Sequence, residues 1–134
     1  MIEIFLSYSR TDKNTVDATI DKLNLSASKY KLWYYNPISK MSMEEILEKL
    51  SATDLFILIA SDNSLNSPYV QKELDKAINL TQEGIIKGIY PILIDNKINV
   101  EVDNRIPGCI KSHFCRAASP AKAAKIIEEI TNKY

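Results

Sequence analysis

One glutamate, Glu73, stands where this chain could carry out chemistry. It follows an apolar run at 55–60, a polar loop, and the pair Ser67 and Pro68, which can begin a helix. Six apolar residues bounded by polar ones predict a strand buried on both faces, as a parallel sheet requires. Ligands of open α/β sheets bind beyond the carboxyl ends of such strands. We therefore expect the Glu73 carboxylate to face a binding crevice.

Helical spacing places Glu73 at the edge of a buried face. That face is predicted from four apolar residues spaced four, three and one apart: Val70, Leu74, Ala77 and Ile78. The neighbouring polar side chains are expected in solvent: Lys72, Asp75, Lys76 and Asn79. From the residues alone, an ordinary boundary carboxylate paired with a lysine explains Glu73 better than a functional one.

A second candidate for a binding site is the polar loop at 7–12, which follows an apolar segment at 2–6 and leads into a helix. The free N–H groups of a helix N-terminus suit a phosphate. Ser7 and Ser9 add hydroxyl donors, and Arg10 adds a bidentate cation. Ser and Thr before a helix usually act only as caps, and that interpretation is the stronger one for this loop taken alone.

Strand and helix patterns alternate along the chain. Strands are predicted at 2–6, 31–35, 55–60, 85–94 and 111–116, and helices at 12–26, 42–51, 68–82 and 119–133. Alternation of this kind predicts a doubly wound parallel sheet in a single α/β domain over residues 1–134. With five strands we expect the flavodoxin-like, three-layer fold with strand order 2-1-3-4-5, in which the loops after strands one and three share a crevice.

Composition narrows the function classes. Seventeen basic and seventeen acidic side chains give no net charge, which offers no support for a nucleic-acid or membrane-surface partner. No segment approaches the roughly 20 apolar residues of a membrane span. The N-terminus enters a strand pattern directly, without the shape of a signal peptide, so we expect a cytoplasmic protein.

Metal and redox chemistry receive little support from the residues. Cys109 and Cys115 fit no C-x-x-C pattern, so two reduced structural thiols are favoured over a disulfide or redox role. The only histidine, His113, is expected on the fifth strand in a structural role. We expect no metal and no bound cofactor. Glycine-dependent phosphate loops are excluded, since the three glycines lie at 84, 88 and 108.

Four segments, in order, resemble a Toll/interleukin-1 receptor (TIR) domain over nearly the whole chain. They are 4–9 (IFLSYS), 32–35 (LWYY), 55–59 with Ser61 and Asn63, and 67–74 (SPYVQKEL). There are departures: Tyr69 stands where many members have Trp, Tyr35 where an acid is common, and the loop at 36–41 has no glycine. A response-regulator receiver shares the topology, but it needs an acidic residue at the end of strand three, where this chain has Ala60 and Ser61.

The resemblance implies a bacterial-type, NAD-cleaving member with Glu73 as its catalytic residue. NAD+ would be the substrate, and the products nicotinamide and ADP-ribose, or a cyclic or adduct form of it. The implied biology is anti-phage or cell-death defence, with a downstream effector protein that senses the nucleotide. The segments that match predict the following substrate-binding residues: Ser7, Tyr8, Ser9, Arg10, Trp33, Ser61, Asn63, Ser67 and Tyr69.

Two points in this interpretation have alternatives. Trp33 could stack on a base, but aromatic residues in strands more often belong to the core. A non-enzymatic TIR–TIR interaction module would fit the same resemblance without needing Glu73. Self-association is expected in either case, through a loop that includes Asn36, Pro37, Met41 and Met43.

Overall fold

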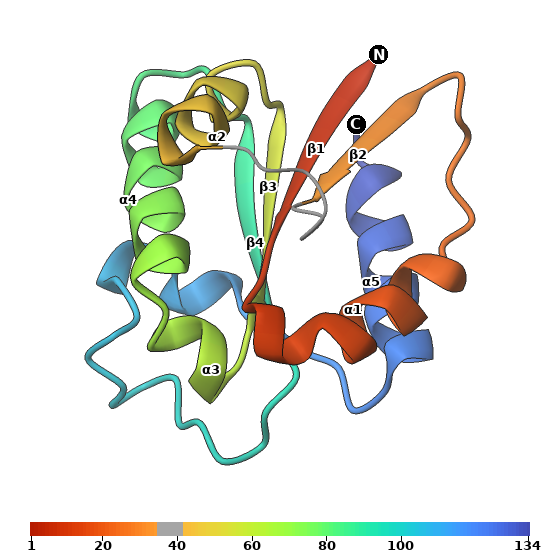
Figure 1. Ribbon diagram of the computed structural model, residues 1–134. Helices are drawn as coiled ribbons and strands as arrows, with labels where there is room; N and C mark the ends of the chain where they lie inside the picture. Colours follow the sequence, from red (N-terminus) through yellow and green to blue (C-terminus); the bar gives the residue numbers. More distant parts are fainter. Residues whose placement is uncertain (35–41) are drawn as a thin grey trace.

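The structure, a computed structural model, describes residues 1–34 and 42–134. Within them, five parallel strands form one sheet in the order β2-β1-β3-β4-β5, which confirms the predicted flavodoxin-like α/β fold. The strands are β1 (Ile2–Ser7), β2 (Tyr30–Tyr34), β3 (Leu55–Ala60), β4 (Gly88–Leu93) and β5 (Cys115–Arg116). The strands β1, β3 and β4 run downward in Figure 1, so their carboxyl ends lie at the lower edge of the sheet.

Helices cover both faces of the sheet (Figure 1). One face carries α1 (Lys13–Asp21) and α5 (Pro120–Thr131); the other carries α2 (Met43–Leu50) and α4 (Pro68–Gln82). Serine hydroxyls cap α2, α4 and α5, each accepting a backbone N–H three residues on, from Ser42, Ser67 and Ser119. Such caps satisfy N–H groups that a helix leaves unpaired, and they fix where each helix begins.

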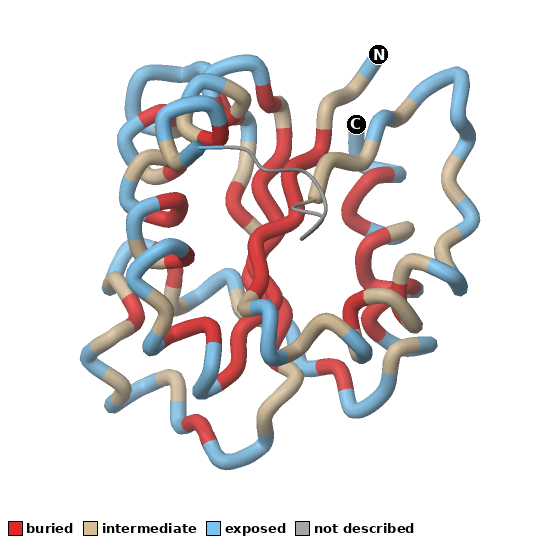
Figure 2. Tube along the Cα trace, viewed as in Figure 1, coloured by how far each residue is buried: buried red, intermediate tan, exposed pale blue. Residues whose placement is uncertain are grey.

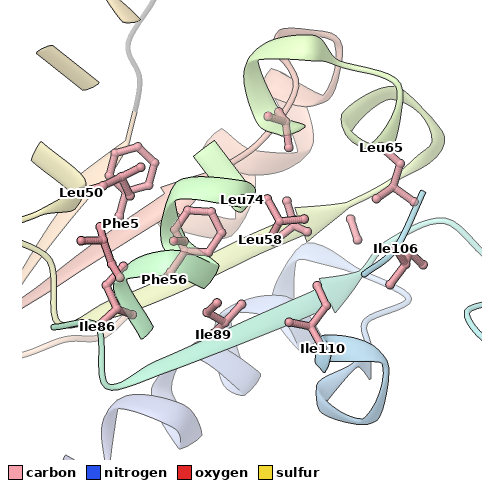
Figure 3. Close-up of a cluster of buried hydrophobic side chains, with 14 of the residues drawn as sticks. Phe5, Leu50, Phe56, Leu58, Leu65, Leu74, Ile86, Ile89, Ile106 and Ile110 are labelled. Atoms are coloured by element: carbon pink, nitrogen blue, oxygen red, sulfur yellow. The ribbon is translucent and has the colours of Figure 1, made fainter. Parts of the chain in front are cut away.

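The core lies on both sides of β3. All six residues of β3 are buried, as the apolar run predicts (Figure 2). On the α2/α4 side, the rings of Phe5 and Phe56 stack with centroids 5.8 Å apart, beside Leu58 and Leu74 (Figure 3). This packing holds the carboxyl ends of β1 and β3 in fixed positions, because close-packed side chains leave strands little freedom to shift.

Several predicted boundaries are wrong. Helix α1 ends at Asp21 instead of 26, and Ala27 is exposed; the backbone N–H groups of Lys29 and Tyr30 turn back to the Ser26 carbonyl. Strand β4 begins at Gly88 instead of 85, because Gly84 ends α4 with a φ of 79° and the N–H groups of residues 85 and 86 bond to the Leu80 carbonyl.

Three short helices lie where none was predicted. A 3-10 helix, η2 (Gly108–His113), replaces the first half of the predicted fifth strand, so His113 does not lie on β5. The predicted loop at 61–67 holds a short helix, α3 (Asp62–Leu65), which Ser61 and Ser64 close with a reciprocal capping box. The loop after β1 holds a 3-10 turn, η1 (Arg10–Asp12), before α1.

Candidate functional site

Glu73 lies in the second turn of α4 and is only 6% exposed. The Ser7 hydroxyl donates a hydrogen bond to Glu73 Oε1 at 2.9 Å. Ser7 is the last residue of β1 and is itself 1% exposed. The carboxylate is therefore fixed at the carboxyl end of β1, where the fold places its ligands.

The environment of this carboxylate opposes its charge. Burial raises the pKa of Glu73 to about 7, although the hydrogen bond from Ser7 acts in the opposite direction. Among residues 1–34 and 42–134, no lysine or arginine forms an ion pair with Glu73. The structure thus gives no support to a boundary glutamate paired with a lysine. A buried, unpaired carboxylate in a cleft is a typical functional-site signature.

A pocket of about 490 Å³ opens beside Glu73. Three elements form it: the loop after β1, the first turn of α2 and the first turn of α4. Its lining residues are Tyr8, Ser9, Arg10, Ser42, Met43, Ile46, Ser67, Tyr69 and Glu73. This volume lies within the range of small-molecule sites. Glu73 and Tyr8 are buried, whereas Arg10 and Tyr69 (68% exposed) are open to solvent, so the acid lies deep and the cation near the mouth.

Most of the predicted binding residues come together around this pocket. Tyr8, Ser9, Arg10, Ser67 and Tyr69 all line it with Glu73. Two of the serines also cap helices, because Ser9 Oγ accepts the Thr11 N–H and Ser67 Oγ accepts the Val70 N–H. Ser7 lies behind the pocket, with its hydroxyl on Glu73.

Other predicted residues lie elsewhere. Trp33 stacks on Phe5 with ring centroids 5.9 Å apart and packs against the core, as strand aromatics usually do. Ser61 and Asn63 line a different cavity, where both donate hydrogen bonds to the Asp12 carboxylate. Of the predicted self-association loop, Met43 lines the Glu73 pocket, and Asn36, Pro37 and Met41 lie outside the described residues.

Sequence reasoning missed two lining residues, Ser42 and Ile46. A signal was present, because the capping pattern at Ser42 and Glu45 fixes the first turn of α2 and with it the position of Ile46. What the pattern lacks is any indication that this turn lies opposite the start of α4. That relation comes from the packing of α2 against α4 on one face of the sheet.

The cysteines and the histidine do not line the Glu73 pocket. Cys109 and Cys115 are both free and exposed, and His113 is exposed on η2. Within residues 1–34 and 42–134, no three His, Cys, Asp or Glu side chains are grouped to hold a metal. The helices in the same residues are too short or too polar to cross a membrane.

A protein family matches most of this chain. The model of the TIR domain family matches residues 4–125, which include every strand-end loop described above. A comparison with curated proteins finds no match. The match covers most of the chain and agrees with the observed strand order. The chain therefore belongs to the TIR domain family.

Proposed function

We propose that this chain is an NAD+ nucleosidase that cleaves the bond between nicotinamide and ribose. The observation that carries the proposal is Glu73, a buried carboxylate with no cationic partner among the described residues, on the wall of a pocket of about 490 Å³. Arg10 and the hydroxyl of Tyr69 add a cation and a hydrogen-bonding group nearer the mouth. A cationic group on the substrate would supply the charge partner that Glu73 lacks.

The reaction needs one carboxylate and no acid. Most glycosidases use a second carboxyl group to protonate the leaving group. In NAD+ the pyridinium is already cationic, and nicotinamide departs as a neutral base with the electrons of the broken C–N bond. The ribose then carries positive charge, which ionised Glu73 stabilises from a water-poor position. Water adds to the ribose carbon and loses a proton, so NAD+ and water give nicotinamide, ADP-ribose and H+.

Nucleophiles other than water can add to the same ribosyl cation. If a hydroxyl or ring nitrogen of the substrate, or another nucleophile, adds in place of water, the product is a cyclic isomer or an adduct of ADP-ribose. We propose that the reaction serves in anti-phage or cell-death defence. It would act either by depleting NAD+ or by forming a nucleotide that an effector protein senses. A product analysis by chromatography and mass spectrometry distinguishes these outcomes; unmodified NAD+ after prolonged incubation would contradict all of them.

The direct test is nicotinamide release by the purified chain. Incubation with NAD+ should give nicotinamide and an ADP-ribose product in equal amounts. The competing function is a TIR–TIR interaction module, to which the family match applies equally well. A folded, self-associating protein that releases no nicotinamide would favour that alternative.

Arg10 is expected to hold the phosphates of NAD+. Arg10→Ala should raise the KM for NAD+ by roughly tenfold to a hundredfold, as the loss of a charged hydrogen-bond partner of about 1.5–3 kcal/mol implies. Lys72→Ala is the matched control, because Lys72 is an exposed cation on α4 that does not line the pocket. Steady-state kinetics measures both. Equal KM values for Arg10→Ala and the unmodified protein would place the phosphates elsewhere.

Self-association is expected to control the activity. Met43 lines the Glu73 pocket and continues directly from the loop that contains Met41, so a neighbouring copy contacting this loop would complete the pocket wall. Specific activity should therefore rise with protein concentration, and Met41→Asp should flatten the rise, because a charge in an apolar contact is left unpaired. A dilution series with light scattering measures both effects. If the protein stayed monomeric and its specific activity stayed constant at every concentration, self-association would not control the activity.

A further inference from the structure

A second cavity, of about 500 Å³, opens at the same edge of the sheet. The turn at 9–12 separates it from the Glu73 pocket: Ser9 and Arg10 line the first, and Asp12 lines the second. The ends of β4 and β5 form its other walls. Its polar lining residues are Asp12, Thr15, Ser61, Asn63, Asp95, Asn96 and Arg116. Ligands of this fold class bind at this edge, beyond the carboxyl ends of the strands.

Two carboxylates that line this cavity, those of Asp12 and Asp95, are held in place by hydrogen bonds. Asp12 accepts hydrogen bonds from the Ser61 hydroxyl and, at 3.2 Å, from the Asn63 amide. Asp95 accepts the N–H groups of Lys97 and Asp62 at 3.0 and 3.2 Å, and these bonds lower the pKa of Asp95. A carboxylate has about four acceptor positions. Each therefore keeps capacity to accept hydrogen bonds from a ligand.

Arg116 also lines the cavity, and its guanidinium can donate hydrogen bonds to a ligand. In residues 1–34 and 42–134, no hydrogen bond or ion pair engages the side chain of Arg116. Arg105 shows the contrast, since it binds Asp103, Asp62 and Asn66 and links two loops. The planar guanidinium of arginine matches the oxygens of phosphate or carboxylate with two parallel hydrogen bonds. Arg116 can therefore offer this fork to a bound anion.

The combination restricts the ligand. The two carboxylates would repel a purely anionic molecule, and Arg116 would repel a purely cationic one. A ligand that carries both an anionic group and hydroxyl donors can pair with Arg116 and with the carboxylates, and carboxylates are the usual partners of ribose hydroxyls. We propose that this cavity binds a phosphorylated ribose, with the phosphate on Arg116 and the hydroxyls on Asp12 and Asp95. This binding does not depend on NAD+ cleavage at Glu73.

The test is an NMR titration of the whole chain with ribose 5-phosphate up to about 10 mM, a range that detects weak binding. The amides of residues 95–96 and 116–118 should shift and saturate. Arg116→Ala and Asp95→Asn should each weaken binding about tenfold or more, since each removes a charged hydrogen-bond partner. Lys72→Ala is the control, because Lys72 is an exposed cation that lines neither cavity, and it should leave the affinity unchanged.

Three results would overturn the proposal: no saturable shift, shifts confined to the residues around Glu73, or the same affinity in Arg116→Ala as in the unmodified protein. Arg116 is exposed at the end of β5, so its removal should leave the amide spectrum dispersed and the comparison valid. Ribose and inorganic phosphate, titrated separately, should bind more weakly than ribose 5-phosphate. Equal binding of phosphate alone would contradict the role of the carboxylates.

Discussion

Glu73→Gln is expected to lower the rate of NAD+ cleavage by about a hundredfold or more, as the loss of a principal electrostatic stabiliser does. The substitution keeps the size of the side chain, and the amide oxygen can still accept the hydrogen bond from Ser7. What it removes is the negative charge that stabilises the oxocarbenium-like transition state. Nicotinamide release under saturating NAD+ measures the effect.

Glu83→Gln is the control for this experiment. Glu83 is exposed directly after α4, so the same change of chemistry is made on the same segment away from the pocket. Its rate should equal that of the unmodified protein. If Glu73→Gln turned over NAD+ at the unmodified rate while folded, Glu73 would not be the catalytic group.

Glu73→Gln should also stabilise the folded protein at alkaline pH. The pKa of Glu73 is raised from its ordinary value of 4.5 to about 7, so the folded state binds this proton more tightly than the unfolded state does. The contribution of Glu73 to stability is therefore full below pH 4.5 and is lost as the pH rises through 7. The difference corresponds to about 3 kcal/mol at alkaline pH.

Glutamine carries no charge, so it does not pay the free-energy cost of burying an ionised carboxylate. At about pH 8, Glu73→Gln should raise the free energy of unfolding by up to about 3 kcal/mol, and at about pH 5 it should have little effect. Urea unfolding at both pH values measures the difference, with Glu83→Gln as the control that shows none. A Glu73→Gln protein no more stable than the unmodified one at the higher pH would mean that the carboxylate is not buried as described. A destabilising group retained in the fold is typical of a functional site.

The order of the elements could be predicted because local patterns define it. The fully apolar β3 indicates a buried parallel strand, and the serines before α2, α4 and α5 mark where these helices begin. The fifth strand could not be predicted in the same way, since only two of its residues pair with β4. Its predicted first half is a 3-10 helix, in which Ile110 is the buried residue.

The site was partly accessible to sequence reasoning. Helical spacing indicates that Glu73 lies at the edge of the buried face, as the structure shows. The partner of its carboxylate is 66 residues away in the chain, so no local pattern predicts the hydrogen bond from Ser7. Ser61 and Asn63 share the sheet edge with Glu73, but the turn at 9–12 divides that edge into two cavities. This division depends on how the η1 turn packs against α3, which spacing along the chain does not reveal.

The pH dependence of kcat/KM tests the central claim most directly, because this parameter reports the pKa of the essential group in the free enzyme. With ionised Glu73 as that group, kcat/KM should fall about tenfold per pH unit below about pH 7. Ser7→Ala removes the hydrogen bond that lowers the pKa, so the midpoint should move to higher pH, whereas Ser7→Thr keeps a hydroxyl and should keep the midpoint. A profile that is flat across neutral pH, or one that Ser7→Ala leaves unmoved, would contradict catalysis by this carboxylate.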